Sequence, residues 1–90
     1  MPEMMARVEV EDFERWLVNH RSQSGRRADY GMTDGPIYRD IDDARAAFVH
    51  LHVEDLDKAR EWFRTEEFAQ ATKKAGVTGR TFFSVAPPTP

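Results

Sequence analysis

The amino-acid sequence predicts an α+β domain with the order strand, helix, strand, strand, helix, strand. Four stretches alternate apolar and polar residues, and two stretches repeat apolar residues at helical spacing. A strand–turn–helix unit also occurs twice, at Val10-Glu11-Asp12-Phe13 and at Val53-Glu54-Asp55-Leu56. With right-handed crossovers, this order gives the ferredoxin-like βαββαβ fold: an antiparallel four-stranded sheet with two helices on one face.

The composition limits the class of protein. A chain of 90 residues has room for one domain, which we place at residues 1–86, followed by a proline-rich tail at residues 87–90. The net charge of −3 gives no general attraction to nucleic acid or to an anionic membrane. No apolar run approaches the roughly 18 residues that cross a bilayer. The chain has no cysteine, which excludes disulfides and fits the cytoplasmic location that we expect.

The first strand and the first helix are predicted within residues 4–20. Met4 to Val10 alternates as a strand does, and Asp12 can cap the helix that follows. The apolar stripe of this helix consists of Phe13, Trp16, Leu17 and His20, with Trp16 expected in the core. The polar stretch from Arg21 to Asp29 is expected to form a solvated loop. Its Arg26 and Arg27 could instead hold a phosphate or a carboxylate.

The middle of the chain is predicted to form two strands joined by a turn. Glycine and proline interrupt the first of them, so we expect strand mainly from Pro36 to Ile41, at an edge or with a bulge. Asp42 and Asp43 are typical turn residues. Ala46 to Val53 alternates most clearly. Its two faces carry Val49, Leu51 and Val53 on one side and Phe48, His50 and His52 on the other.

The second helix is expected to begin after Asp55, a capping residue, and to kink or restart at Thr65. Gly76 is a natural helix stop, and the last strand is predicted from Gly79 to Val85. The apolar stripe of the helix consists of Leu56, Ala59 and Phe63, with Trp62 on its flank.

The sheet face away from the helices is expected to mix charged and large apolar side chains. Its expected members are Arg7, Glu9, Tyr38, Phe48, His50, His52 and Phe82. A solvent-facing sheet does not normally show such aromatic groups to water. We therefore expect a homodimer in which two sheets lie face to face.

The charged groups on this face suggest a polar cluster. We expect the first and third strands to be parallel neighbours, which places Glu9 level with His52. The same alignment places Arg7 level with His50. Either histidine could act as a general base on a small phenolic or enol-like ligand. The alternative is a network of salt bridges and hydrogen bonds that only fixes the dimer.

A metal site is a further interpretation of the same cluster. His50, His52 and Glu9 would offer two imidazoles and a carboxylate to iron, manganese or zinc. A His-x-His pair alone is a weak motif, however, and Arg7 next to it would oppose a cation. We therefore expect neither a metal nor a cofactor.

Several motifs taken together resemble a known superfamily. They lie at residues 10–13, 38–43, 53–56, 62–71 and 75–79. In these segments the chain resembles the dimeric α+β barrel superfamily, in particular the small proteins like the antibiotic-biosynthesis monooxygenases. The resemblance implies a dimeric barrel with a kinked second helix. It leaves the activity open, because the superfamily includes oxygenases, isomerases, haem-degrading enzymes and proteins with no known activity.

The resemblance also implies a pocket between the second helix and the sheet. Trp62 matches a tryptophan that lines this pocket in the oxygenase-like members. Thr72 stands where the haem-degrading members carry an iron-ligand histidine, so we do not expect haem degradation. His50 and His52 are the predicted catalytic residues. The expected pocket residues are Trp62, Phe63, Phe68, Thr72, Arg7, Glu9, Tyr38 and Phe82.

Two functions from different classes remain. The first is a cofactor-independent monooxygenase or isomerase that acts on a small aromatic or polyketide-like molecule. In such an enzyme the substrate supplies the electrons, and the protein supplies a dry pocket and a base. The second is a non-catalytic dimer that binds a small ligand or serves in a stress response. An open cavity beside Trp62 would favour the first, and a filled barrel with every polar group paired would favour the second.

Overall fold

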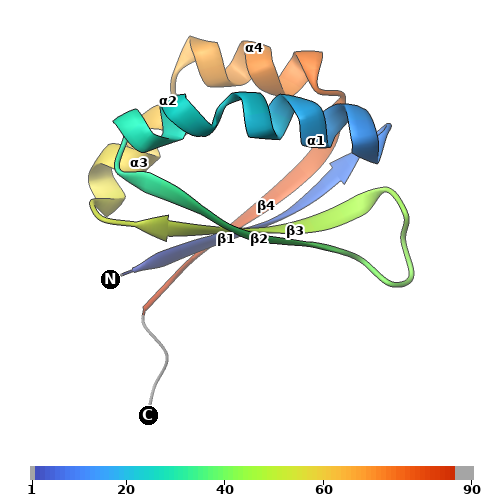
Figure 1. The fold of residues 1–90 in the computed structure, drawn as a ribbon, viewed down its shortest axis with the longest axis horizontal. Coiled ribbons are helices and arrows are strands. Elements are labelled where there is room, and N and C mark those ends of the chain that lie inside the picture. The colour runs from blue at the N-terminus through green and yellow to red at the C-terminus, as the bar shows by residue number, and fades with distance from the viewer. Residues whose placement is uncertain (1, 87–90) are drawn as a thin grey trace.

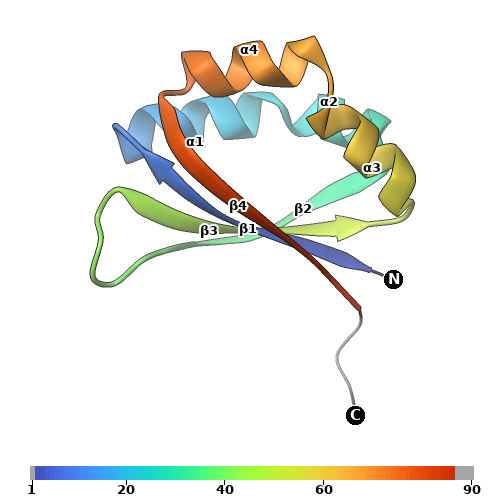
Figure 2. The same ribbon diagram turned by 180° about the vertical axis from the view of Figure 1, so that it is seen from behind.

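The computed structural model describes residues 2–86, which form two layers (Figure 1). In chain order the elements are β1 (Glu3–Val10), α1 (Phe13–Ser22), α2 (Ser24–Asp29), β2 (Met32–Arg39), β3 (Ala46–Val53), α3 (Leu56–Phe63), α4 (Glu66–Lys74) and β4 (Val77–Val85). All the helices lie over one face of the sheet, and no element of the described chain covers the other face (Figures 1 and 2). The tail predicted at residues 87–90 lies outside the described residues.

The four strands form one sheet in the order β2-β3-β1-β4, and every neighbouring pair is antiparallel. The predicted ferredoxin-like fold class is therefore confirmed. The prediction that the first and third strands run parallel is wrong. A helical crossover joins β1 to β2, which run in the same direction, and β3 lies between them after a tight reversal. A strand inserted in this way must run opposite to both neighbours.

The core lies between the sheet and the helices. Alternate residues of β1 and β3 point into it, as the sequence pattern predicts. Trp16 and Trp62, from α1 and α3, are 3% and 1% exposed. The strand contribution to the core consists of Met4, Ala6, Val8, Val10, Met32, Ala47, Val49, Leu51 and Val53.

Both predicted helices are interrupted. The restart at Thr65 is confirmed, because its side-chain oxygen accepts a hydrogen bond from the backbone N–H of Phe68 at 3.1 Å. The prediction of a loop at residues 21–29 is wrong, because α2 occupies most of that stretch. No helix of the described chain has the length and apolar character needed to cross a bilayer.

Contacts with two other elements, α4 and β2, hold the polar helix α2 in place. Arg26 makes two hydrogen bonds of 2.8 Å with the carboxylate of Glu67 on α4. Arg27 makes a similar pair, of 2.7 and 2.8 Å, with Asp34 on β2, and it is only 5% exposed. The two arginines therefore bind carboxylates of the chain itself, in the forked geometry that guanidinium groups favour.

The second strand lies earlier in the sequence than predicted. It ends at Arg39, and Ile41 is 97% exposed outside it. Its predicted edge position and irregularity are both confirmed, because β2 ends the strand order and its register shifts between Asp34 and Ile37. Gly35 lies in this irregularity. A Cβ atom there would come within 2.8 Å of the carbonyl oxygen of His50.

Candidate functional site

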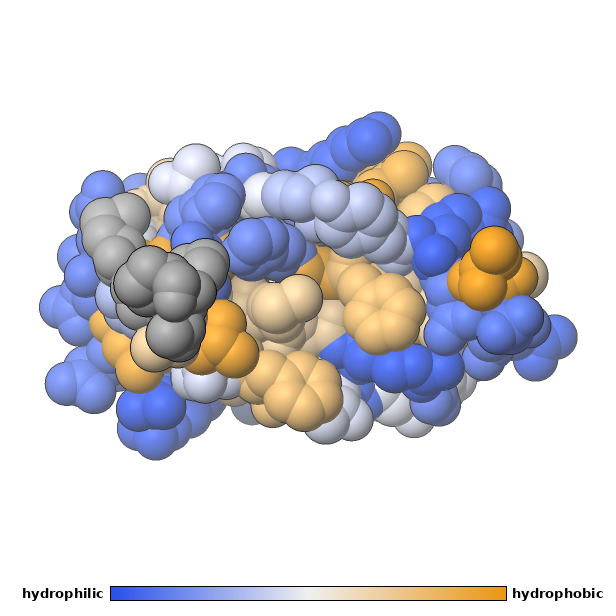
Figure 3. All heavy atoms as spheres, turned by 90° about the horizontal axis from the view of Figure 1, so that it is seen from below, coloured by the Kyte–Doolittle hydropathy of each residue, from blue (hydrophilic) through white to orange (hydrophobic). Residues whose placement is uncertain are grey.

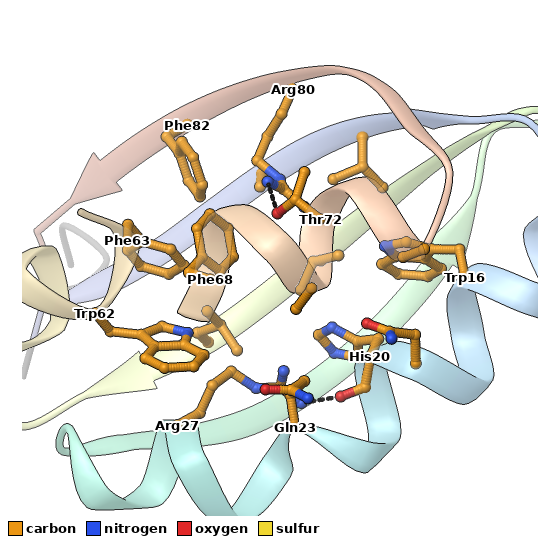
Figure 4. Close-up of a pocket in the computed structure, with 17 residues that line it drawn as sticks. Trp16, His20, Gln23, Arg27, Trp62, Phe63, Phe68, Thr72, Arg80 and Phe82 are labelled. Carbon is orange, nitrogen blue, oxygen red and sulfur yellow. Dashed lines mark hydrogen bonds between the residues drawn. The ribbon is translucent and has the colours of Figure 1, made fainter. Parts of the chain in front are cut away.

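A cavity of about 60 Å³ lies between the helices and the sheet (Figure 4). Side chains from β1 and β3 form its floor, the helices form its walls, and β4 borders it. Its aromatic lining consists of Trp16, Trp62, Phe63, Phe68 and Phe82. The space suffices for a few water molecules but is well below the roughly 300–1,000 Å³ of pockets that hold drug-sized ligands.

Aromatic contacts run from the centre of the cavity to its rim. Trp62 meets Phe68 edge to face at 5.9 Å between ring centroids, and Phe68 meets Phe63 in the same way at 5.0 Å. Phe63 in turn lies 4.8 Å from Phe82 on the edge strand β4. Phe82 is 40% exposed, so it can move with less loss of packing than the buried tryptophans. The rim at β4 is therefore the part of the wall that can open most easily.

Arg80 is the main charged group in the cavity wall. Its Nη1 donates a hydrogen bond of 3.1 Å to Thr72, and its guanidinium lies over the rings of Phe68 and Phe82. Within residues 2–86, no carboxylate lies within salt-bridge distance of it. Burial lowers the pKa of Arg80 to about 10, which leaves it charged at neutral pH. The wall therefore presents a positive charge that the described chain does not neutralise.

His20 faces the same cavity. Its ring stacks on Trp16 with centroids 5.0 Å apart. Burial, reinforced by the positive charge of Arg27, lowers the pKa of His20 to about 4. The imidazole is therefore neutral at physiological pH and offers a hydrogen-bond acceptor together with a donor.

Gln23 supplies an unused acceptor. It lies at the junction of α1 and α2 and lines the cavity, on the side opposite Arg80 and Thr72 (Figure 4). Its Oε1 is buried and has no hydrogen-bond partner among the described residues. Because a buried polar atom normally has a partner, this oxygen is suited to a hydroxyl or N–H group of a bound molecule.

A second group of polar residues lies on the outer face of the sheet. In the antiparallel register Glu3 pairs with His52 and Arg7 with Phe48, which corrects the predicted clusters of Glu9 with His52 and of Arg7 with His50. The Arg7 guanidinium instead contacts the carboxylate of Glu9 on its own strand at 2.7 Å.

Apolar side chains share this outer face. Figure 3 looks onto it and shows apolar groups across its middle with hydrophilic groups around them. Exposed members of this apolar group are Met5, Tyr38, Phe48, Phe83 and Val85. The prediction that Phe82 belongs here is wrong. Phe82 pairs with Ala6 and points to the helix side, whereas the next residue, Phe83, points outward.

The structure divides the predicted site residues between the two faces of the sheet. Those that line the cavity are Trp62, Phe63, Phe68, Thr72 and Phe82. Those on the outer face are Arg7, Glu9, Tyr38, His50 and His52. Sequence reasoning missed Arg80 and Gln23 as cavity residues. Arg80 lies two residues from Phe82 on β4 and so shares its face, but the sequence analysis assigned Phe82 to the outer face and therefore could not indicate Arg80. No sequence signal points to Gln23.

Comparisons with known proteins show the same fold. No family model and no curated protein match the sequence. An antibiotic-biosynthesis-monooxygenase candidate from Bordetella bronchiseptica superposes with a TM-score of 0.75 at 14% identity, covering 98% of this chain and 97% of the other. A mutant form of SnoaB, a cofactor-independent oxygenase from Streptomyces nogalater, gives a TM-score of 0.71 at 15% identity over 99% and 96%. The resemblance to antibiotic-biosynthesis-monooxygenase-like proteins is therefore confirmed for the fold.

Proposed function

We propose that the protein binds a small aromatic molecule with an ionisable oxygen in this cavity and oxidises it with dioxygen, without a cofactor. The observation that supports the proposal is Arg80, a largely buried cation without a carboxylate partner among residues 2–86. A phenolate, enolate or carboxylate would supply the missing negative charge, while the aromatic walls would contact the ring. A hydroxyl at the far end of the ligand would donate to Oε1 of Gln23.

The same arrangement supports oxidation of an enolisable methylene compound. The overall reaction is R₂CH₂ + O₂ → R₂C=O + H₂O. Two C–H bonds and the O–O bond break, one oxygen atom forms the carbonyl, and the other leaves as water with the two hydrogens. The carbon supplies the four electrons that dioxygen takes up. The enolate must form first, by loss of a proton from the carbon to solvent before the anion enters the cavity. Arg80 would then stabilise the bound anion, and the apolar walls would shield it from further water.

A second candidate is binding without turnover. The low pKa of His20 favours it, because an imidazole with a pKa of about 4 is a weak base for a carbon acid. In either case a ring can enter this small cavity only if Phe82 and Arg80 swing outward at the rim. Both candidates share the ligand and differ only in the chemistry that follows.

Tryptophan fluorescence tests the binding of an anionic aromatic ligand in the cavity, because both tryptophans of the chain line it. We expect benzoate to change the emission saturably and its neutral isostere benzamide to bind at least tenfold more weakly. Arg80→Met keeps the length of the side chain but removes the charge, so it should abolish this preference, whereas Arg80→Lys should retain part of it. Equal binding of benzoate by the wild type and by Arg80→Met would refute the proposal.

Oxygen uptake separates the two candidates. With anthrone, whose enol carries an ionisable hydroxyl, an oxygenase should consume dioxygen faster than the buffer control, and Arg80→Met should lose most of that increase. Fluorescence-detected binding of the anionic probe with no uptake above the control would instead support a binding protein.

We also infer a homodimer formed through the outer face of the sheet. The apolar side chains on that face are exposed together rather than singly. A second copy placed face to face would cover them and give a closed two-sheet barrel. The cavity lies on the opposite side of each sheet, so both copies would keep their own site.

A further inference from the structure

We propose that Glu3, His50 and His52 form a binding site for a divalent transition-metal ion, of which Zn²⁺ is the best-suited example. The three side chains converge on the outer face of the sheet. Nδ1 of His52 lies 2.9 Å from Oε2 of Glu3, and Nε2 of His50 lies 3.1 Å from the same oxygen. One donor atom from each residue lies within 4.8 Å of the other two.

The strands themselves hold the three donors in place. Glu3 and His52 are direct partners in the antiparallel pairing of β1 with β3. His50 lies two residues from His52 on β3, so its side chain points to the same face. The rings of the two histidines are in contact, with centroids 4.9 Å apart. Buried core residues alternate with these donors along both strands, so the positions of the donors are set by the sheet rather than by a loop.

The donor set selects a class of metal. Two imidazole nitrogens and one carboxylate suit zinc, copper and nickel, whereas calcium and magnesium prefer sites made of oxygen alone. Tetrahedral ligands at bond lengths of about 2.0–2.1 Å lie about 3.3–3.4 Å apart. The nitrogen–oxygen separations of 2.9 and 3.1 Å are thus within a few tenths of an ångström of that geometry. An ion could replace the two hydrogen bonds after a small outward movement of the rings.

The local charges favour a cation. Arg7, which the sequence-based prediction placed beside His50, is held instead by Glu9, Asp40 and Asp43. The hydrogen bond from His52 is the main reason that the pKa of Glu3 is lowered, so the carboxylate is anionic. Within residues 2–86, no lysine or arginine forms an ion pair with Glu3. In the single chain the side chains of His50 and His52 are 27% and 43% exposed, and in the inferred homodimer they would lie at the interface between the two sheets.

Calorimetric titration tests the site on tag-free protein that has been stripped of metal with a chelator. At pH 7.5 we expect one Zn²⁺ per chain with micromolar or tighter affinity, and a rise in Tm when Zn²⁺ is added. His52→Asn and Glu3→Gln should each weaken binding at least tenfold. Glu14→Gln is the matched control, because it removes an exposed carboxylate on α1, on the other side of the sheet from the cluster. Its affinity should stay within twofold of the wild type.

Two further measurements ensure that an unfolded variant is not mistaken for the loss of the metal site. Co²⁺ bound to the wild type should show the intense visible absorption of a tetrahedral site, and acidification should weaken its binding, because protons compete with a metal for its ligands. Circular dichroism establishes that each variant is folded. Absence of one-to-one binding in the wild type would overturn the proposal, as would unchanged affinity in a folded His52→Asn. Neither result would bear on the proposed ligand site in the cavity, which lies on the other side of the sheet.

Discussion

His20 couples the stability of the protein to pH. Its folded-state pKa of about 4 lies below the ordinary value of 6.5, so the unfolded chain binds the proton more readily. The stabilising contribution is complete above pH 6.5 and is lost as the pH falls towards 4. We expect the free energy of unfolding to fall by about 1–2 kcal/mol between pH 7 and pH 5 through this group. Urea unfolding at the two pH values measures the change.

His20→Gln provides the control for this prediction, because every other titratable group is the same in both proteins. Glutamine keeps a polar group of similar length but has no proton to gain in this range. The difference in unfolding free energy between pH 7 and pH 5 should therefore shrink in the variant. An undiminished difference would mean that other groups cause the acid sensitivity.

The individual cavity residues could be predicted only in part. Trp62, Phe63 and Phe68 were expected there from helical spacing together with a family resemblance, and all of them line the cavity. Gln23 and His20 could not be expected as a pair. Their positions depend on the break between α1 and α2, and α2 is in turn held by the contacts of Arg26 with Glu67 and of Arg27 with Asp34.

Two glycines give opposite predictions for the elements that contain them. Gly35→Ala would place a Cβ atom 2.8 Å from the backbone carbonyl of His50, so β2 would have to move away from β3. We expect a loss of about 1–3 kcal/mol, as for other overpacked sites. Gly25→Ala in α2 meets nothing within 4 Å. It should leave stability unchanged or raise it by up to about 1 kcal/mol, because alanine is the better helix former.

Chemical denaturation of the two glycine variants measures both effects. Equal stabilities would contradict the close packing of β2 on β3. Helix content alone does not report the effect of Gly35→Ala, since the affected contact lies within the sheet. The midpoint and the slope of the unfolding curve together report it.

At the scale of elements, the alternation of apolar and polar residues predicted the bounds of an element correctly where one of its faces is buried. The predicted bounds of β3, Ala46 to Val53, agree with the structure because every second residue contacts the core. The short helix α2 escaped prediction because its residues are polar, and ion pairs with β2 and α4 hold it. The direction of a strand depends on how the strands are connected and cannot be seen in the residue pattern. The prediction that the first and third strands run parallel was therefore wrong, and it misplaced Glu9 and Arg7 relative to His50 and His52.

The homodimer is a prediction about the whole molecule. Phe48 lies among the exposed apolar side chains of the outer face. Phe48→Glu would place a charge in the proposed interface, so it should convert the dimer to a monomer in light scattering coupled to gel filtration. Val18→Glu is the control, because Val18 is 71% exposed on α1 and away from the sheet. A wild type that is monomeric at high concentration would contradict the proposed barrel.

The proposed function requires that the cavity, rather than the outer face of the sheet, holds an anionic aromatic ligand. The most direct test is an NMR titration of the ¹⁵N-labelled protein with benzoate. We predict saturable shifts of the Trp62 indole N–H and of the backbone amides of Thr72 and Arg80, with much smaller shifts at His50 and His52. Shifts confined to the outer face, or none that saturate, would contradict the proposed site.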